Sequence, residues 1–254
     1  MMPKSVMWKE LTAADLREKA EAGAIVLMPV ASMEQHGPHL PVGVDTYLSE
    51  GLCKATAEAI VGDTPVVVAP TLWCGMAEHH MAFGGTFTLD IPTYRAVLLC
   101  LLRSLERHGF RKVLIVNGHG GNIAALASFL PDLARELPGL ALRVTTPYQP
   151  AQQAIAKVLE DQDDGVHHAC EAETSLMMVF APDTVRTDKL AEAHGPPHWT
   201  PPPAGVGRFL SFRDATASGV VGDARRASAE KGEKLVAAIR DCLAAILRDP
   251  RTWS

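Results

Sequence analysis

The sequence lacks the features that mark membrane-spanning, secreted and nucleic-acid-binding proteins. A membrane-spanning helix requires about 20 apolar residues in a row, and none of the apolar runs in this sequence approaches that length. Its net charge is −5 and it contains no polybasic stretch, so we expect no nucleic acid and no membrane surface as a partner. The N-terminus has no apolar segment of signal-peptide length, and we therefore expect a cytoplasmic protein.

Cysteine is scarce, and the catalytic motifs of several enzyme classes are missing. The five cysteines are scattered and include no CxxC pair, which argues against a disulfide framework and for a reducing compartment. The chain has no GxSxG nucleophile elbow and no HExxH zinc-protease helix. We interpret the cysteines, including Cys170, as small core residues rather than nucleophiles.

Apolar runs of strand length alternate with helical patterns along the chain. Hydrophobic residues make up 47% and charged residues 21% of the 254 residues, as in ordinary globular proteins. Buried strands are predicted at 24–30, 64–70 and 112–116, with a further strand at 140–146 and a weaker one at 87–89. Helices are predicted at 11–23, 46–61, 92–108, 122–137, 151–159, 172–180 and 227–248, and Pro131 is expected to kink or divide the fourth. This order predicts one α/β domain over residues 1–254, with a three-layer α/β/α architecture and a mostly parallel sheet.

Histidines gather in the loops of this predicted fold. Most of the ten follow a predicted strand or precede a helix, namely His36, His39, His79, His80, His119, His167 and His168. Open parallel sheets bind ligands outside the carboxyl ends of their strands. A lone histidine is more often a core or surface residue, but several beside carboxylates at one sheet edge predict a common pocket.

The first cluster, residues 33–45, has the sequence MEQHGPHLPVGVD. Glu34 and His36 are two residues apart, so an extended backbone places both side chains on one face. Asp45 follows after a turn rich in glycine and proline. Such a carboxylate–imidazole set suits Zn²⁺, Mn²⁺ or Fe²⁺. In the alternative interpretation Asp45 caps the next helix and the other two are solvated loop residues; Asp45 could also cap that helix while bridging two metals.

The second cluster, VNGHGGN at residues 116–122, runs from a strand through glycines into a helix. Its glycine spacing fits neither the dinucleotide fingerprint nor the phosphate-binding P-loop. We therefore interpret the glycines as letting the backbone approach a metal that His119 ligates.

The third cluster, HHACEAETS at residues 167–175, opens a helix. Carboxylates are favoured in a first helical turn by the helix dipole alone. Either Glu171 or Glu173 could instead complete a metal shell, while His168 acts as a general acid or base. A proline-rich loop at 196–207, with His198 and Trp199, is expected to cover the site or to contact a neighbouring subunit.

With these motifs in this order, the chain resembles the creatininase family of metal-dependent amidohydrolases over nearly its whole length. The matching segments are SMEQHGPHLPVGVDTYLSE, MAEHHMAFGGTFTL, VNGHGGN, HHACEAETSLMM and SGVVGDARRASAEKGEKL. The resemblance places metal ligands at Glu34, His36, Asp45 and His119, with Asp45 as the bridging carboxylate, and puts His168 and Glu173 at characteristic positions of the fourth motif. It implies a three-layer α/β/α fold, two divalent metal ions per subunit (Zn, Mn or Fe), hydrolysis of a C–N bond in a small-molecule amide, and a homo-oligomer, often a hexamer.

The chain departs from creatininase itself at three positions. Gly121 stands where a glutamate ligates metal, Gly120 where a tyrosine stands, and Asp164 where a tryptophan covers the substrate. The resemblance therefore predicts little creatinine hydrolysis and extends to branches that deformylate a ribosylaminopyrimidine or cleave the mycofactocin precursor. The missing ligand is expected from Glu173 first and Glu171 second, and the residue left over, Glu171, is predicted to assist His168 in catalysis. A binding protein that keeps the fold and a single metal, without hydrolysis, is the competing class.

Overall fold

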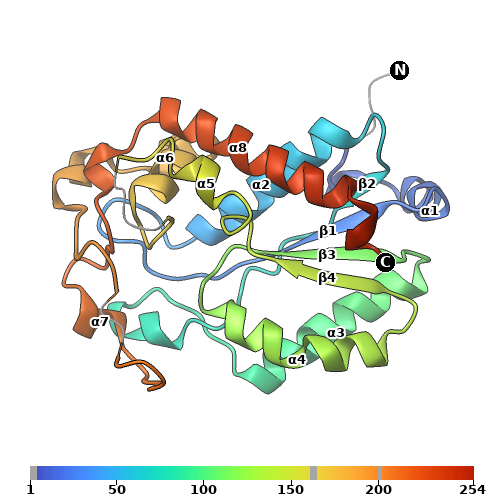
Figure 1. Ribbon diagram of the computed structural model, residues 1–254, viewed down its shortest axis with the longest axis horizontal. Helices are drawn as coiled ribbons and strands as arrows, with labels where there is room; N and C mark the ends of the chain where they lie inside the picture. Colours follow the sequence, from blue (N-terminus) through green and yellow to red (C-terminus); the bar gives the residue numbers. More distant parts are fainter. Residues whose placement is uncertain (1–4, 161–164, 200–201) are drawn as a thin grey trace.

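A computed structural model, which describes residues 5–160, 165–199 and 202–254, contains a four-stranded parallel sheet (Figure 1). Its order is β2-β1-β3-β4, formed by β2 Val66–Val68, β1 Ile25–Val30, β3 Lys112–Asn117 and β4 Ala141–Thr145. Helices cover both faces, which confirms the predicted three-layer α/β/α class.

The central strand β1 is apolar throughout because both of its faces are covered. All six of its residues are buried. Val26 and Met28 point into one core, and Ile25 and Leu27 point into the other, as the alternation of side chains along a strand requires. β1 pairs with β3 from Ile25 opposite Lys112 to Val30 opposite Asn117, so both strands end at the same edge of the sheet.

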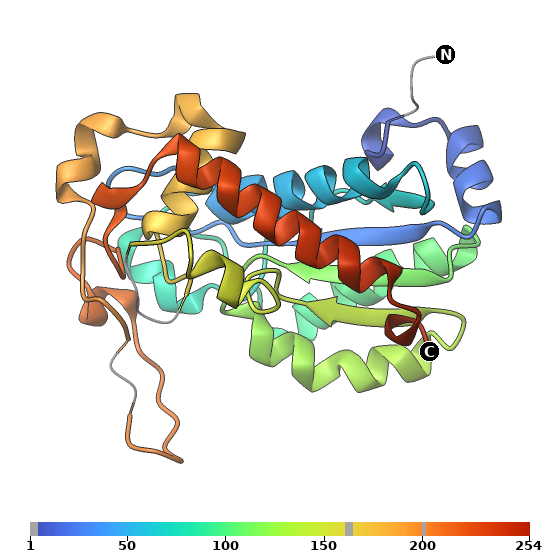
Figure 2. The ribbon, with the colours of Figure 1, turned by 45° about the horizontal axis from the view of Figure 1, so that its top comes forward.

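Two helical layers enclose the sheet (Figures 1 and 2). One face is covered by α3 Ile91–Arg107 and α4 Asn122–Glu136, and α1 Ala13–Glu21 lies at the amino end of β1. The other face is covered by α2 Val44–Ile60 and α8 Ala229–Arg248. Beyond the carboxyl edge of the sheet, α6 Glu171–Phe180 packs against α2 and α8, with α5 Gln152–Ile155 and α7 Phe212–Ala215 nearby.

Side chains at the helix ends explain where several helices begin. Thr12 forms a reciprocal capping box with Asp15 before α1. Asp90 accepts a hydrogen bond from the Thr93 N–H before α3, and Ser228 accepts one from the Lys231 N–H before α8. Asp45, by contrast, does not cap α2: Gly43 stands at the cap position and Asp45 lies inside the first turn.

Three local predictions were wrong. Residues 87–89 form no strand, because Phe87 makes a single antiparallel bridge, with Met33, and does not join the sheet. Pro131 does not divide α4, which runs unbroken from Asn122 to Glu136. The helix expected at 151–159 is reduced to the single turn of α5, after which the chain turns and the Glu160 N–H binds the Glu171 carboxylate.

Within the described ranges, no helix combines the length and the apolar character needed to cross a membrane.

Candidate metal centre

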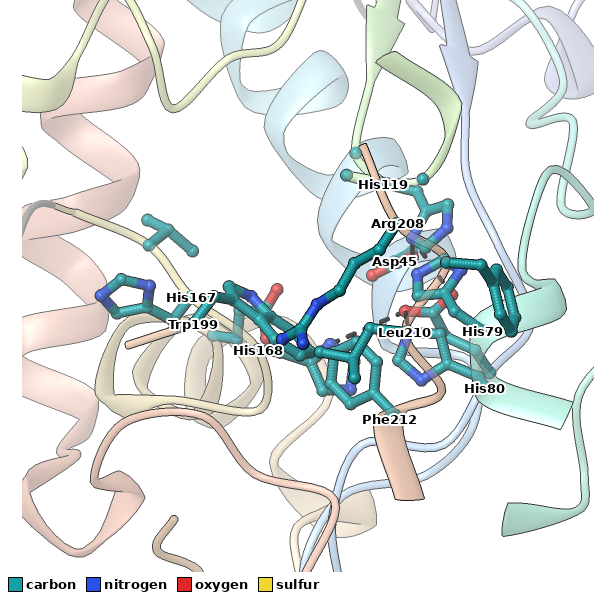
Figure 3. Close-up of a pocket in the computed structure, with 17 residues that line it drawn as sticks. Asp45, His79, His80, His119, His167, His168, Trp199, Arg208, Leu210 and Phe212 are labelled. Atoms are coloured by element: carbon teal, nitrogen blue, oxygen red, sulfur yellow. Dashed lines mark ion pairs between the residues drawn. The ribbon is translucent and has the colours of Figure 1, made fainter. Parts of the chain in front are cut away.

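Five side chains that the sequence singled out lie together at the carboxyl edge of the sheet. Figure 3 shows two of them, Asp45 and His119, beside the cavity. Ligand atoms of Glu34, Asp45 and His119 lie within 4.8 Å of one another, and those of His36, Asp45 and Glu173 form a second such group. All five side chains are buried. Because Asp45 belongs to both groups, we name this set the five-residue cluster and treat it as one site.

The two imidazoles of the cluster are oriented by main-chain carbonyls. The His36 Nδ1–H donates to the carbonyl of Glu34 at 3.2 Å, which leaves Nε2 facing Asp45 Oδ1 at 3.3 Å and Glu173 Oε2 at 3.8 Å. The His119 Nε2–H donates to the carbonyl of Met76 at 3.1 Å, which leaves Nδ1 3.1 Å from both Glu34 Oε2 and Asp45 Oδ2. A carbonyl can only accept, so each ring presents its other nitrogen to the cluster, and this nitrogen can ligate a metal ion that displaces its proton.

The turn that carries His119 is held by an asparagine. The side-chain amide of Asn117 donates to the His119 carbonyl at 2.8 Å, and the His119 N–H donates back to Asn117 Oδ1 at 3.2 Å. Asn122, at the start of α4, donates to Asn117 Oδ1 at 3.2 Å. The glycine-rich turn is therefore a fixed loop that points His119 toward β1.

Residue 121 is a glycine and contributes no carboxylate to the cluster. A Cβ on Gly121 would collide with the Met76 carbonyl and the His119 ring. Glu173 occupies the cluster from the first turn of α6 instead, and its Oε2 accepts the Ala169 N–H at 2.5 Å. Ala169 has a φ of 51°, which is uncommon for a residue other than glycine and aims this N–H at the carboxylate.

Three buried ligand atoms of the cluster have no hydrogen-bond partner among the described residues. They are Glu34 Oε2, His36 Nε2 and Asp45 Oδ2. Leaving a polar group buried and unpaired costs about 1–3 kcal/mol, and more if the group is charged. These atoms belong to the carboxylate and imidazole groups that divalent transition metals prefer, so the residues present fit a two-metal centre.

Burial and crowded charge shift the pKa values of the cluster. Burial alone would lower the pKa of His36, but the carboxylates of Asp45, Glu173 and Glu34 outweigh it and raise the pKa to about 9. Burial raises the pKa of Glu173 to about 7. Burial would likewise raise the pKa of Asp45, but the neighbouring imidazoles of His119 and His36 hold it below its usual range. Three carboxylates in one buried site favour cations over an empty cavity.

Two residues that the sequence did not single out as functional, Gln35 and His80, complete the site. Gln35 Oε1 accepts the Gly37 N–H at 2.9 Å, so its amide nitrogen donates to the Gly219 carbonyl and to His80 Nδ1, both at 3.1 Å. His80 must then carry its proton on Nε2, which lies 3.2 Å from Glu34 Oε1. The histidine-rich loop was visible in the sequence, but its partner Gln35 is 45 residues away.

His168 lines the cavity beside the cluster. Its Nε2–H donates to the Gln35 carbonyl at 2.7 Å, and its Nδ1 lies 3.7 Å from Glu34 Oε1. Burial and then the charge of His36 lower the pKa of His168 well below its ordinary value. The neutral ring therefore directs a lone pair toward the cluster and can accept a proton there.

Glu171 does not lie in the cavity. Its carboxylate accepts hydrogen bonds from Lys231 Nζ at 2.5 Å and from the Glu160 N–H at 3.1 Å. Residues two apart on a helix point about 200° apart, so when Glu173 faces the cluster Glu171 faces α8. The catalytic role predicted for Glu171 has no support in this geometry.

The cavity in front of the cluster has a volume of about 530 Å³. Trp199 and Phe212 form part of its wall, with ring centroids 4.3 Å apart in an edge-on arrangement. Figure 3 shows Arg208 reaching across the opening. Trp199 thus lies where the proline-rich loop was expected to cover the site, whereas Asp164 and residues 200–201 lie outside the described residues.

Comparisons with known proteins agree with this geometry. The family model described as "Creatininase: Creatinine amidohydrolase" matches residues 9–247. The creatinine amidohydrolase of Pseudomonas putida is 32% identical over 250 residues, covering 92% of this chain and 93% of that protein. The mycofactocin precursor peptide peptidase of Mycolicibacterium smegmatis is 32% identical over 217 residues, covering 84% of this chain and 80% of that protein.

Solved structures show the same fold. A structure described as "Creatininase Mn" superimposes with a TM-score of 0.83 at 28% identity, over 96% of this chain and 98% of that chain. A variant creatininase of Zn-Zn type gives a TM-score of 0.83 at 28% identity, over 97% and 98%.

Proposed function

Because this chain belongs to the creatininase family of amidohydrolases, we propose that it hydrolyses a small-molecule amide with two divalent metal ions. The observation that carries the proposal is the convergence of three buried, unpaired ligand atoms around Asp45. Glu34, Asp45 and His119 would hold one ion, and His36, Asp45 and Glu173 the other, with Asp45 bridging. Zinc, manganese and iron all suit this donor set, and creatininase structures with manganese and with zinc support the first two.

The residues of the site divide the work of amide hydrolysis. Bound divalent ions would supply an activated water and polarise the scissile carbonyl. As the water oxygen bonds to the carbonyl carbon, His168 accepts a proton at Nδ1, and it returns that proton to the nitrogen as the C–N bond breaks. The Gln35 carbonyl holds the opposite nitrogen of this ring in its protonated form throughout.

The substrate is expected to differ from creatinine. Gly120 and Gly121 stand at two positions where creatininase carries larger side chains, so we expect little or no turnover of creatinine. Formamides, lactams and short peptides are the classes to test, because relatives include a peptidase and the sequence also resembles deformylases. Turnover of creatinine at about 10 per second, a rate typical of metabolic enzymes, would contradict this expectation.

Metal analysis combined with activity profiling tests the proposal. Protein loaded with Zn²⁺ or Mn²⁺ is expected to hold two equivalents per chain and to hydrolyse at least one of these amide classes. Asp45→Ala should lose both ions, since Asp45 serves both groups. One equivalent or none in the unaltered protein, without hydrolysis, would favour the non-hydrolytic metal-binding alternative.

We also propose a homo-oligomer, with a hexamer as the expected form, in the reducing environment of the cytoplasm. Figure 2 shows the segment 202–210 projecting from the body, and on it Val206 is 55% and Phe209 71% exposed. Large apolar side chains exposed on a projecting segment are typical of subunit contacts. The five free cysteines support a reducing compartment. Sedimentation of the purified protein as a monomer would contradict the oligomer.

A further inference from the structure

His79 is a histidine of the cavity wall that the proposed division of work does not use. It is half-buried and lines the cavity from the 3₁₀ turn Glu78–Phe83. Its ring stacks on that of His119, with centroids 5.6 Å apart and planes at 18°, and its centroid lies 4.3 Å from that of His80 (Figure 3). Both of these neighbours contact the Glu34 carboxylate, so His79 lies directly beside the five-residue cluster.

The hydrogen-bonding atoms of this ring are not used by the protein. Among the described residues, neither ring nitrogen of His79 forms a hydrogen bond or an ion pair. By contrast, a main-chain carbonyl binds one ring nitrogen in each of His36, His119 and His168. A neutral imidazole has one donor and one acceptor, and at His79 both remain available to a molecule in the cavity.

Two glycines keep the space around this ring open. A Cβ on Gly121 would lie 2.7 Å from His79 Cε1, so the His79 ring occupies space that a side chain at position 121 would enter. A Cβ on Gly120 would meet no atom within 4 Å, so the neighbouring part of the cavity wall is open as well. The glycines that distinguish this chain from creatininase thus leave His79 accessible from the cavity.

Packing holds the His79 ring in place although no hydrogen bond does. Besides the two imidazoles, the Phe212 ring lies against it at a centroid distance of 5.6 Å. Phe212 is also 4.6 Å from the ring of His168, whose Nδ1 faces the cluster, so His79 and His168 border the same part of the cavity. A ring that is already fixed loses little entropy when it binds a ligand, and its hydrogen bond therefore contributes more to affinity.

We propose that His79 is a substrate-binding residue that forms a hydrogen bond with the scissile amide. This inference rests on the proposed function, because the metal centre places that amide beside the ring. An amide carries both an acceptor, its carbonyl oxygen, and a donor, its N–H, so either tautomer of His79 can pair with it. No ligand group found within the described part of the chain includes His79, so its contact is with the substrate rather than with an ion. His79 thus orients the amide, and His168 carries the proton.

Acetohydroxamate tests this contact, because hydroxamates chelate metal ions and present a carbonyl and an N–H like those of an amide. Its affinity for the zinc-loaded, full-length protein is measured by calorimetry, together with the zinc content. His79→Leu retains an apolar side chain for packing but forms no hydrogen bond, so we expect affinity to fall about fivefold, the equivalent of a net hydrogen bond of about 1 kcal/mol. His79→Gln has both a donor and an acceptor and should stay within about twofold of the unaltered protein. Both variants should retain two zinc equivalents.

His108→Leu is the matched control, because His108 is exposed at the end of α3 and does not line this cavity. Its affinity for acetohydroxamate should equal that of the unaltered protein.

Three results would overturn the inference: unchanged affinity in His79→Leu, equal weakening in the leucine and glutamine variants, or loss of zinc from His79→Leu. The second would show that the ring acts by packing alone, and the third that it supports the metal ions. In each case the unaltered protein, with its zinc and its bound acetohydroxamate, retains the proposed metal centre and loses only the His79 contact. Failure of the unaltered protein to hold zinc or to bind acetohydroxamate would instead contradict the metal centre and, with it, the contact.

Discussion

At the scale of single residues, proton placement decides what each side chain in the site can do. Carbonyl groups fix the protonated nitrogens of His36, His119 and His168, and Gln35 fixes that of His80. The first three rings turn their other nitrogen toward the cluster, whereas His80 presents an N–H to Glu34. His80 is therefore suited to orient a ligand rather than to be one.

The two glutamates of α6 give the sharpest test of the ligand assignment. Glu173→Gln removes a carboxylate from one of the two ligand groups, so we expect loss of one metal equivalent and of most activity. Glu171→Gln should keep both equivalents and instead lower the free energy of unfolding by about 2 kcal/mol, because it weakens hydrogen bonds between charged groups. Metal counting and urea denaturation of both variants check this. The reverse pattern would transfer the ligand role to Glu171, and two ions in both variants would show that neither is a ligand.

His80 should control metal affinity through the orientation of Glu34. Loss of a side chain that orients a metal ligand weakens metal affinity about 10–100-fold. We therefore expect His80→Ala to weaken zinc binding by that factor. His80→Gln can still donate to Glu34 and should lie within about threefold of the unaltered protein. Competition with a chromogenic chelator measures both, and equal affinities in the alanine variant and the unaltered protein would refute the role.

At the scale of elements, the site depends on how closely α6 approaches α8. Gly232 of α8 lies against the carbonyl of Ser175 in α6, with Val179 on the same side. Ser175 also donates to the Glu171 carbonyl and accepts the N–H of Ser228, the cap of α8. These contacts fix the rotation of α6 about its axis, which in turn directs Glu173 into the cluster and Glu171 toward Lys231.

Gly232→Ala is expected to be destabilising although alanine favours helices. The new methyl group would collide with the Ser175 carbonyl and force the two helices apart, which costs about 1–3 kcal/mol. Gly62→Ala is the matched control: its Cβ would meet nothing within 4 Å, so its stability should be unchanged within about 0.5 kcal/mol. Thermal and urea denaturation compare the two. Equal stability of both variants would contradict the close packing described here.

At the scale of the whole molecule, the site joins segments that are far apart in the chain. The side chains of the five-residue cluster come from the loop after β1, from α2, from the loop after β3 and from α6. The C-terminal segment closes the site from the other side, since Gly219 accepts a hydrogen bond from Gln35 across 184 residues. Metal binding should therefore stabilise the fold as a whole.

Removal of metal should lower the melting temperature. A ligand at 100 times its dissociation constant stabilises the folded state by about 2.7 kcal/mol per site, and 1 kcal/mol is worth about 2–4 °C in a chain of this size. Treatment with a chelator is thus expected to lower the melting temperature by at least about 5 °C, and added Zn²⁺ should restore it. Scanning calorimetry measures this shift, and the Asp45→Ala variant is the control, in which the chelator should cause no shift. If the melting temperature of the unaltered protein were also unchanged by the chelator, the metal centre would be contradicted.

The sequence by itself was sufficient to predict the architecture and the identity of the clustered residues. Three continuous apolar runs predicted strands buried in a parallel sheet, because only strands covered on both faces lack polar alternation. Glu34, His36, Asp45 and His119 were found because loops after neighbouring parallel strands meet at one edge. The metal-ligand roles of these residues stay predictions that the metal counts test.

Only the tertiary structure decided which glutamate faces the cluster, and it also revealed the positions of Gln35 and His80. Spacing showed that Glu171 and Glu173 point in different directions, but the rotation of α6 is set by its packing against α8, which no local pattern records. The same is true of Phe87, which pairs with Met33 instead of entering the sheet. In each case the outcome depends on contacts between residues distant in the chain, and their free energies outweigh the local preferences that a sequence displays.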